Sequence, residues 1–312
     1  MRRTPLLALL AALFLLSPAR AAYECPAAGE KAEDCPWAGA ARLAAGGDIE
    51  KVLREHAPGL LVQMDADKAN GRLLGLWGES INYDELAEGR IVDPALLSFI
   101  ASRVGAKAPD GRIMHAGAEH TYGYLFSLLP TKFGFKRARW VRPDIEDGLG
   151  LPRGTAGPSP SSGTLLSNVT CIAGGIALRD DPRAFAALRE AGASCAPAAR
   201  RFLDFAARRV RLTEDVELPG GRTVSLRTDF VDFEKSSGGN SRLLIYSVRD
   251  SAAGPAYLVT AFPVSGEFEE KATAQSGLGA GKPVQTRYNA FVRGLTGAGK
   301  FRGRRAVSRP EK

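Results

Sequence analysis

Hydrophobic residues recur at helical spacing in three parts of the chain before residue 210. Residues 93–105 begin with an Asp-Pro pair, carry hydrophobic residues three or four positions apart, and end in Gly. This is the pattern of an amphipathic helix with an acidic cap and a glycine stop. Residues 181–192 repeat the pattern, and a third stripe runs from residue 197 to about 210. We therefore expect a helix in each range.

After residue 210 the period of the hydrophobic residues falls to two. Residues 223–233, 242–249 and 256–264 alternate between hydrophobic and polar positions, as strands with one buried face do. The segments between them are short and rich in Gly, Ser and Asp, so we expect an antiparallel meander. A last stripe at helical spacing predicts a helix that covers one face of this sheet. Its members are Val284, Tyr288, Phe291, Val292 and Leu295.

Helices followed by strands, without alternation of the two, indicate an α+β fold. We expect a helix-rich N-terminal half, followed by an antiparallel β-meander with a covering C-terminal helix. Twelve of the 22 residues from 142 to 163 are Pro, Gly or Ser, which predicts a long loop between two regions of the chain. The expected parts are a helical or mixed region (22–145), the loop (146–163), an α+β region with the sheet (164–299) and a basic tail (300–312).

Residues 1–21 have the pattern of a secretory signal peptide. Arg2 and Arg3 precede an unbroken hydrophobic run of eleven residues, and Ala19 and Ala21 are small residues of the kind that a signal peptidase accepts. The run is too short to span a bilayer, which needs about 20 such residues. We expect the protein to be exported, either periplasmic or secreted, without stable membrane insertion after cleavage.

The charge of the chain is concentrated at its two ends. The formal net charge is +8, of which the arginines of residues 1–21 contribute three, and residues 300–312 hold six basic residues and one acidic residue. The body, residues 22–299, therefore sums to zero. With 45% hydrophobic and 24% charged residues it has the composition of an ordinary globular protein. We expect the basic tail to be disordered. The alternative is that the tail has a function and binds an anionic polymer.

Four cysteines, Cys25, Cys35, Cys171 and Cys195, are an even number in a chain predicted to be exported. This favours disulfides, and the lower entropy cost of closing short loops favours the pairs Cys25–Cys35 and Cys171–Cys195. The spacings lack the C-x-x-C pattern of a zinc or redox site.

Two further motifs match known sites only in part. Residues 294–300 fit a phosphate-binding loop, but Phe301 stands where its Ser or Thr belongs. Residues 65–71 imitate a calcium loop, but Ala69 replaces the third ligand and the glycine comes one position late. No motif of a zinc protease, serine esterase or penicillin-binding enzyme is present, and no cofactor is expected. Asn168 begins an N-x-T triplet, a glycosylation acceptor only in a eukaryotic secretory route.

The stretch from residue 115 to 140 holds the strongest candidate for chemistry, and it reads HAGAEHTYGYLFSLLPTKFGFKRARW. His115 and His120 can serve as a base and acid pair, because an unperturbed imidazole titrates near pH 6.5. Lys132 and Arg137 can hold a phosphate and stabilise charge in the transition state. Aromatic rings for substrate bases come from Tyr122, Tyr124 and Trp140. Together they predict a metal-independent, ribonuclease-like hydrolase of phosphodiesters.

The spacing of the histidines sets a condition on this hypothesis. Residues five apart do not share a face of a helix or of a strand, so the two rings meet only if the chain turns between them. The small residues 116–118 permit a turn, with a strand that ends near Met114 and a helix that begins near His120. A metal site made of His115, Glu119 and His120 is the alternative, although its spacing matches no standard zinc motif.

The same residues also fit a purely structural role. Tyr122, Leu125 and Phe126 resemble the buried side of a short helix, and the cations from 132 to 142 then form a solvated basic rim. Two functional classes therefore remain open. The protein is either the hydrolase described above, or a non-catalytic secreted or envelope protein that contacts an acidic partner through its basic rim and tail.

Overall fold

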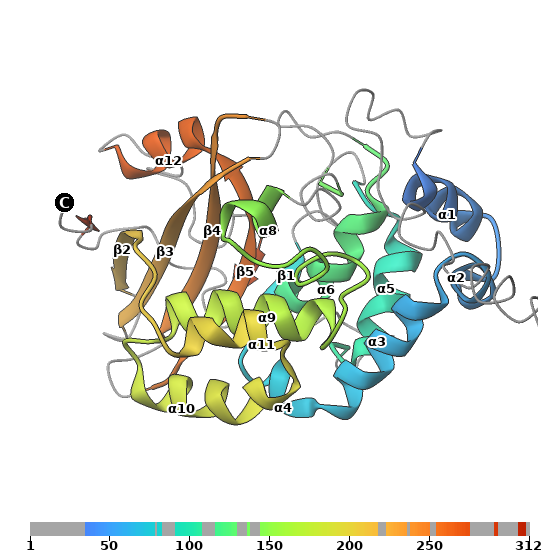
Figure 1. Cartoon of the computed structure of the whole chain (residues 1–312), viewed down its shortest axis with the longest axis horizontal. Helices are drawn as coiled ribbons and strands as arrows, with labels where there is room; N and C mark the ends of the chain where they lie inside the picture. Colours follow the sequence, from blue (N-terminus) through green and yellow to red (C-terminus); the bar gives the residue numbers. More distant parts are fainter. Residues whose placement is uncertain are drawn as a thin grey trace, which may run out of the picture.

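The computed structural model describes residues 35–78, 80–82, 91–107, 116–129, 136–137, 144–217, 223–235, 238–249, 254–274, 290–292 and 305–309. Helices dominate the first half of these residues and strands the second, which confirms the predicted α+β fold (Figure 1). None of the helices that the structure describes has both the length and the hydrophobicity that crossing a membrane requires.

Most of the first group of helices lies at one end of the molecule in Figure 1. It comprises α1 (Pro36–Ala45), α2 (Ile49–His56), α3 (Pro58–Ala69), α4 (Gly71–Leu74), α5 (Pro94–Val104) and α6 (Ala116–Gly123), which continues into the 3-10 turn η3 (Tyr124–Phe126). The predicted helix at residues 93–105 is α5. The Asp93 side chain accepts a hydrogen bond from the backbone of Ala95, and Gly105 ends the helix at a φ of 81°.

The second group of helices surrounds α9. It comprises α8 (Asp144–Gly148), α9 (Leu165–Ala177), α10 (Pro182–Ala191), the turn η4 (Gly192–Ser194), α11 (Pro197–Arg200) and the turn η5 (Arg201–Leu203). Helix α10 confirms the second predicted helix, with Asp181 as its cap and Gly192 at its end. Every residue of α9 is buried, because α9 packs on the sheet on one side and contacts other helices elsewhere (Figure 1).

The sheet has five antiparallel strands in the order β5-β4-β3-β2-β7. Its strands are β2 (Val210–Glu217), β3 (Thr223–Glu234), β4 (Asn240–Arg249), β5 (Ala256–Ser265) and β7 (Arg305–Ser308). Strands β3, β4 and β5 are the predicted meander. One face of the sheet packs on α9 and α6, and the other carries a second hydrophobic cluster that includes residues of α12 (Gly266–Thr273).

Three segments differ from the prediction. The helix expected from 197 to about 210 ends at Arg200, and after η5 the strand β2 begins at Val210. In a strand, neighbouring residues point to opposite faces, so Leu212 faces one side of the sheet and Arg211 the side of α9. The described part of the last hydrophobic stripe is the short strand β6 (Ala290–Val292), which pairs with β1 (Ser80–Asn82). The helix that follows the meander is therefore α12. In the predicted disordered tail, β7 adds to the edge of the sheet.

The Pro, Gly and Ser-rich loop is held by α8 at its start. Glu146 is buried and accepts hydrogen bonds from the backbone of Gly154 and of Ala156, so a single carboxylate fixes the turn of the loop. One hydrophobic cluster contains residues from both sides of this loop. The regions before and after the loop therefore share a core.

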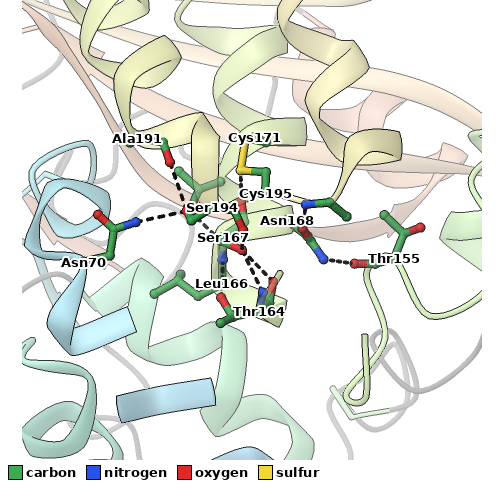
Figure 2. The surroundings of a disulfide bond; sticks show 12 residues. Asn70, Thr155, Thr164, Leu166, Ser167, Asn168, Cys171, Ala191, Ser194 and Cys195 are labelled. Carbon is green, nitrogen blue, oxygen red and sulfur yellow. Dashed lines mark hydrogen bonds between the residues drawn. A yellow bond between two sulfur atoms is a disulfide. The ribbon is translucent and has the colours of Figure 1, made fainter. Parts of the chain in front are cut away.

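The disulfide Cys171–Cys195 joins the middle of α9 to the segment before α11, as predicted (Figure 2). Beside it, Ser194 accepts a hydrogen bond from Asn70. Asn168 is fully buried and bonds to Thr155 and to the backbone of Ala196, so it is no glycosylation acceptor in the folded chain (Figure 2). Cys35 is also disulfide-bonded, and its predicted partner Cys25 lies outside the described residues.

Candidate functional site

Helix α6 carries the described part of the predicted site into the core, where it packs against α5, α9 and β5. Gly117 allows this close packing, since a Cβ atom at this position would lie 1.9 Å from the carbonyl oxygen of Val259. The expected turn at residues 116–118 is absent from this described segment. The helix begins at Ala116, four residues earlier than expected, and the glycine provides space for a strand.

His120 lies in the core with an exposed fraction of only 2%. Its Nδ1 atom is 3.0 Å from the hydroxyl of Tyr124, one turn later, and the two rings stack with centroids 4.5 Å apart. Burial, together with the positive charge of Lys136, lowers the pKa of His120 well below 6.5. The imidazole is therefore neutral at pH 7.

Lys136 and Arg137 belong to the predicted basic rim, yet both are buried. The Nζ atom of Lys136 lies 4.1 Å from the centre of the Tyr124 ring, a cation–π contact. Arg137 donates hydrogen bonds to the side chain and to the carbonyl of Ser127, the former at 3.0 Å from its backbone nitrogen. These two cations are thus not solvated. His115, Lys132 and Trp140 lie outside the described residues.

Tyr122 points to a different set of partners from Tyr124. Its hydroxyl donates to Oδ2 of Asp67 at 2.5 Å, and Thr164 donates to Oδ1 of the same carboxylate at 2.5 Å. Asp67 is 1% exposed, and burial raises its pKa to about 6 although both hydrogen bonds act in the opposite direction. Both tyrosines are buried, so neither ring is an exposed surface for stacking of a base.

This Asp67 cluster was not predicted from the sequence, because its members come from α3, from α6 and from the cap of α9. Thr164 also accepts a hydrogen bond from the backbone of Ser167 and so begins α9. The capping pattern of residues 164–167 is a local signal that could have indicated this helix start. The pairing of Asp67 with Tyr122 has no local signal.

A second polar cluster lies on the sheet face that carries α9. Arg211 donates to both carboxylate oxygens of the buried Asp229, at 2.7 and 2.9 Å, and to the carbonyl of Ala177 at the end of α9. Asp180 pairs with Arg211 and, at 2.6 Å, with Arg209. Burial raises the pKa of Asp229, while the two arginines act in the opposite direction. The carboxylates of this cluster are thus matched by guanidinium groups.

Residues 179–211, which we call the arginine segment, include Asp180, Arg209 and Arg211 of this cluster. The segment contains eight arginines and four acidic residues, a net charge of +4. Arg200 and Arg208 are exposed, and so is 44% of Phe205. The guanidinium of Arg201 lies 5.9 Å from the centre of the Phe205 ring. The segment therefore presents exposed guanidinium groups and a partly exposed aromatic ring to solvent.

Comparisons with known proteins give no match: no family model, no curated protein and no solved structure resembles the chain. Among the residues that the structure describes, no group of three or more His, Cys, Asp and Glu side chains is arranged to hold a metal ion. The function must therefore be argued from the chain's own surface and core.

Proposed function

We propose that the protein is an exported, non-catalytic binding protein that contacts an acidic partner through the arginine segment. The observation that carries this proposal is the net charge of +4 on residues 179–211 within a body, residues 22–299, whose charges sum to zero. The remainder of the body is therefore net negative, and the excess positive charge lies on α10, on α11 and on residues 208–211 at the start of β2. Such separation attracts anionic surfaces and orients them on approach.

The chemistry of the exposed groups fits phosphate or carboxylate partners. Guanidinium groups donate paired hydrogen bonds to both kinds of anion, and they remain charged at any physiological pH. The exposed ring of Phe205 offers hydrophobic contact or stacking beside Arg201. The signal-peptide pattern of residues 1–21 and the disulfide Cys171–Cys195 support export to an oxidising compartment.

A histidine-based hydrolase of phosphodiesters is the second candidate. The observation in its favour is that His120, Tyr124 and Lys136, all from the predicted stretch, do meet in one cluster. Acid–base catalysis requires contact between the imidazole and the reacting atoms. His120 is 2% exposed and neutral, so this function needs an opening of the core around α6.

A binding and turnover experiment on single-stranded RNA separates the two functions. The purified mature chain is titrated against labelled RNA in EDTA at several salt concentrations, by fluorescence anisotropy, and the RNA is then checked for cleavage. We expect salt-sensitive binding without cleavage. The double variant Arg200→Gln/Arg208→Gln should weaken binding and lower the slope of log affinity against log salt by about one for each phosphate that is no longer bound.

The matched control is Lys51→Gln/Arg54→Gln, which removes the same charge from exposed positions of α2, at the opposite end of the molecule (Figure 1). It should bind RNA as the unmodified chain does. Equal weakening by both double variants would refute a role for the arginine segment. RNA cleavage in EDTA that disappears in a folded His120→Gln variant would instead establish the hydrolase.

A further inference from the structure

Three arginines form a diagonal across the sheet, one on each of the neighbouring strands β2, β3 and β4. Arg227 on β3 lies directly opposite Ser247 on β4, and the positions of Arg211 and Arg249 are diagonal neighbours of Arg227. Residues opposite each other in an antiparallel pair point to the same face, and alternate residues of a strand share that face. All three guanidinium groups therefore project on the α9 side, where Arg211 bonds to the carbonyl of Ala177.

The two outer arginines are paired. Arg211 holds Asp229 and Asp180, as described above. Arg249 lies 3.4 Å from a carboxylate oxygen of Asp181 and donates to the carbonyl of Gly254 at 3.0 Å. These contacts neutralise the charge at both ends of the diagonal and leave its centre to Arg227.

Arg227 is the arginine without a counter-ion. Within the described parts of the chain no carboxylate lies within 4.0 Å of its guanidinium, and its Nη1 atom is buried without a hydrogen-bond partner. The nearest carboxylates, Asp180 and Asp229, are already occupied by Arg209 and Arg211. A buried donor that makes no hydrogen bond is costly, so the fold gains if an acceptor reaches it.

The charged groups around Arg227 also favour binding of an anion. Burial and the repulsion from Arg211 and Arg249 lower the pKa of Arg227, although Asp180 and Asp229 act in the opposite direction. Three arginines, Arg209, Arg211 and Arg227, face two carboxylates here. The cluster thus holds one positive charge in excess, which one bound anion would balance.

Ser247 supplies a second donor at the same place. Its side chain has no exposed surface, and its Oγ atom has no hydrogen-bond partner in the described structure. It is fully buried at the register position opposite Arg227. The Nη1 atom of Arg227 and the hydroxyl of Ser247, both buried without an acceptor, therefore share one face of neighbouring strands.

We propose that Arg227 and Ser247 bind a tetrahedral oxyanion, phosphate or sulfate, with Arg249 at its edge. The guanidinium fork takes two oxygens in its plane, and the serine hydroxyl takes a third. A carboxylate has only two oxygens, so the hydroxyl must share an oxygen with the guanidinium fork, whereas a tetrahedral anion offers each donor an oxygen of its own. The site does not depend on the proposed contact of the arginine segment with an acidic partner, because a free anion is sufficient to fill it.

Calorimetric titration of the mature chain with inorganic phosphate at low ionic strength tests the site. Arg227→Gln should weaken phosphate binding by about tenfold or more, since hydrogen bonds to charged groups contribute enough for that factor. Ser247→Ala should weaken it by a smaller factor. The control Arg54→Gln removes the same charge from exposed α2 and should bind phosphate as the unmodified chain does.

Sulfate and acetate are titrated in parallel. Binding of phosphate, sulfate or both, with weaker binding of acetate, supports the proposal. It is overturned if neither tetrahedral anion binds, if Arg227→Gln binds as tightly as the unmodified chain, or if acetate binds as tightly as phosphate. Urea unfolding without added anion should show Arg227→Gln to be at least as stable as the unmodified chain, which separates lost binding from lost folding. RNA binding that fails while phosphate binding holds would count against the proposed function alone.

Discussion

Buried titratable side chains fasten helix α6 on two sides. Asp67 accepts hydrogen bonds from Tyr122 and Thr164. His120 is hydrogen-bonded to Tyr124, whose ring also contacts Lys136. Each of these groups would be costly to bury alone. The hydrogen bonds among them offset part of this cost and fix the rotation and depth of the helix, which gives these residues a structural role in the core.

Asp67→Asn should change how stability depends on pH. The folded-state pKa of Asp67 is raised to about 6 from 3.8, so the folded chain binds the proton more tightly than the unfolded chain. The contribution of this group is fully present below pH 3.8 and is lost as the pH rises to about 6, a fall in the free energy of unfolding of about 3 kcal/mol. Asparagine cannot titrate, and the variant should lack this fall.

Urea unfolding of both proteins between pH 4 and pH 7 measures the difference. His120 contributes in the opposite direction, since its lowered pKa makes unfolding easier as the pH falls below 6.5. That contribution is common to both proteins and cancels when their curves are subtracted. Parallel curves would show that Asp67 has an ordinary pKa in the folded chain.

Side-chain caps are the residue-level feature that the sequence predicted best. Asp93 and Asp181 cap α5 and α10 as expected, because a cap is made within three residues along the chain. The burial of His120 and Lys136 has no such local origin. It follows from where α5, α9 and β5 place α6, and the spacing of the two histidines could not reveal it.

At the scale of elements, the contact between α6 and β5 positions the candidate cluster. Gly117 brings the helix backbone against the carbonyl of Val259, and the ring of Trp77 borders the same space. A helix that approaches a strand this closely has no freedom to shift without breaking the packing of its neighbours. The glycine therefore sets the depth of every later residue of α6.

Gly117→Ala should destabilise the protein strongly. The added Cβ would lie 1.9 Å from the carbonyl oxygen of Val259, so the helix must move, and overpacking of this kind costs roughly 2–3 kcal/mol. Gly39→Ala in α1 is the matched control, because nothing packed against this position lies within 4 Å of the added Cβ, and alanine favours helix by about 1 kcal/mol. The midpoint of urea unfolding should fall in Gly117→Ala and not in Gly39→Ala. A fall in both variants, or in neither, would contradict the close contact between Gly117 and Val259.

The elements that the sequence predicted correctly are those with an uninterrupted period. Strands β3, β4 and β5 show clear alternation, and all three are confirmed. The start of strand β2 was wrongly predicted as helix, because Arg208, Arg209 and Arg211 mask the alternation of Val210 and Leu212. Arg209 and Arg211 can lie at the inner face because Asp180 and Asp229 pair with them there, and this contact joins distant parts of the chain.

At the scale of the whole molecule, the helices and the sheet share a core through α9. This helix touches β3, β4 and β5 on one side and α3, α6, α10 and α11 elsewhere, so both halves of the chain depend on it. The candidate anion site has the same non-local origin. Arg227 on β3 and Ser247 on β4 are brought opposite each other only by the register of the two strands. The same holds for the neighbouring pair, Arg211 on β2 and Asp229 on β3.

The disulfide Cys171–Cys195 should stabilise this arrangement mainly by restricting the unfolded chain. It closes a loop with a sequence separation of 24, for which the loss of chain entropy corresponds to about 3 kcal/mol. Cys171→Ala/Cys195→Ala should therefore lower the free energy of unfolding by about that amount. Because the crosslink also keeps the unfolded chain compact, its removal should raise the dependence of this free energy on urea concentration.

Resistance to reductant provides a second measure of the same bond. Both cysteines are buried in the folded chain, at 0% and 4% exposure, so dithiothreitol should reach them only after unfolding. In urea with reductant, the unmodified chain should unfold at the lower urea midpoint of the double alanine variant. In reductant without urea, the folded chain should keep the disulfide. An unchanged midpoint in the variant would mean that the packing of α9, and not the crosslink, holds residues 192–203 in place.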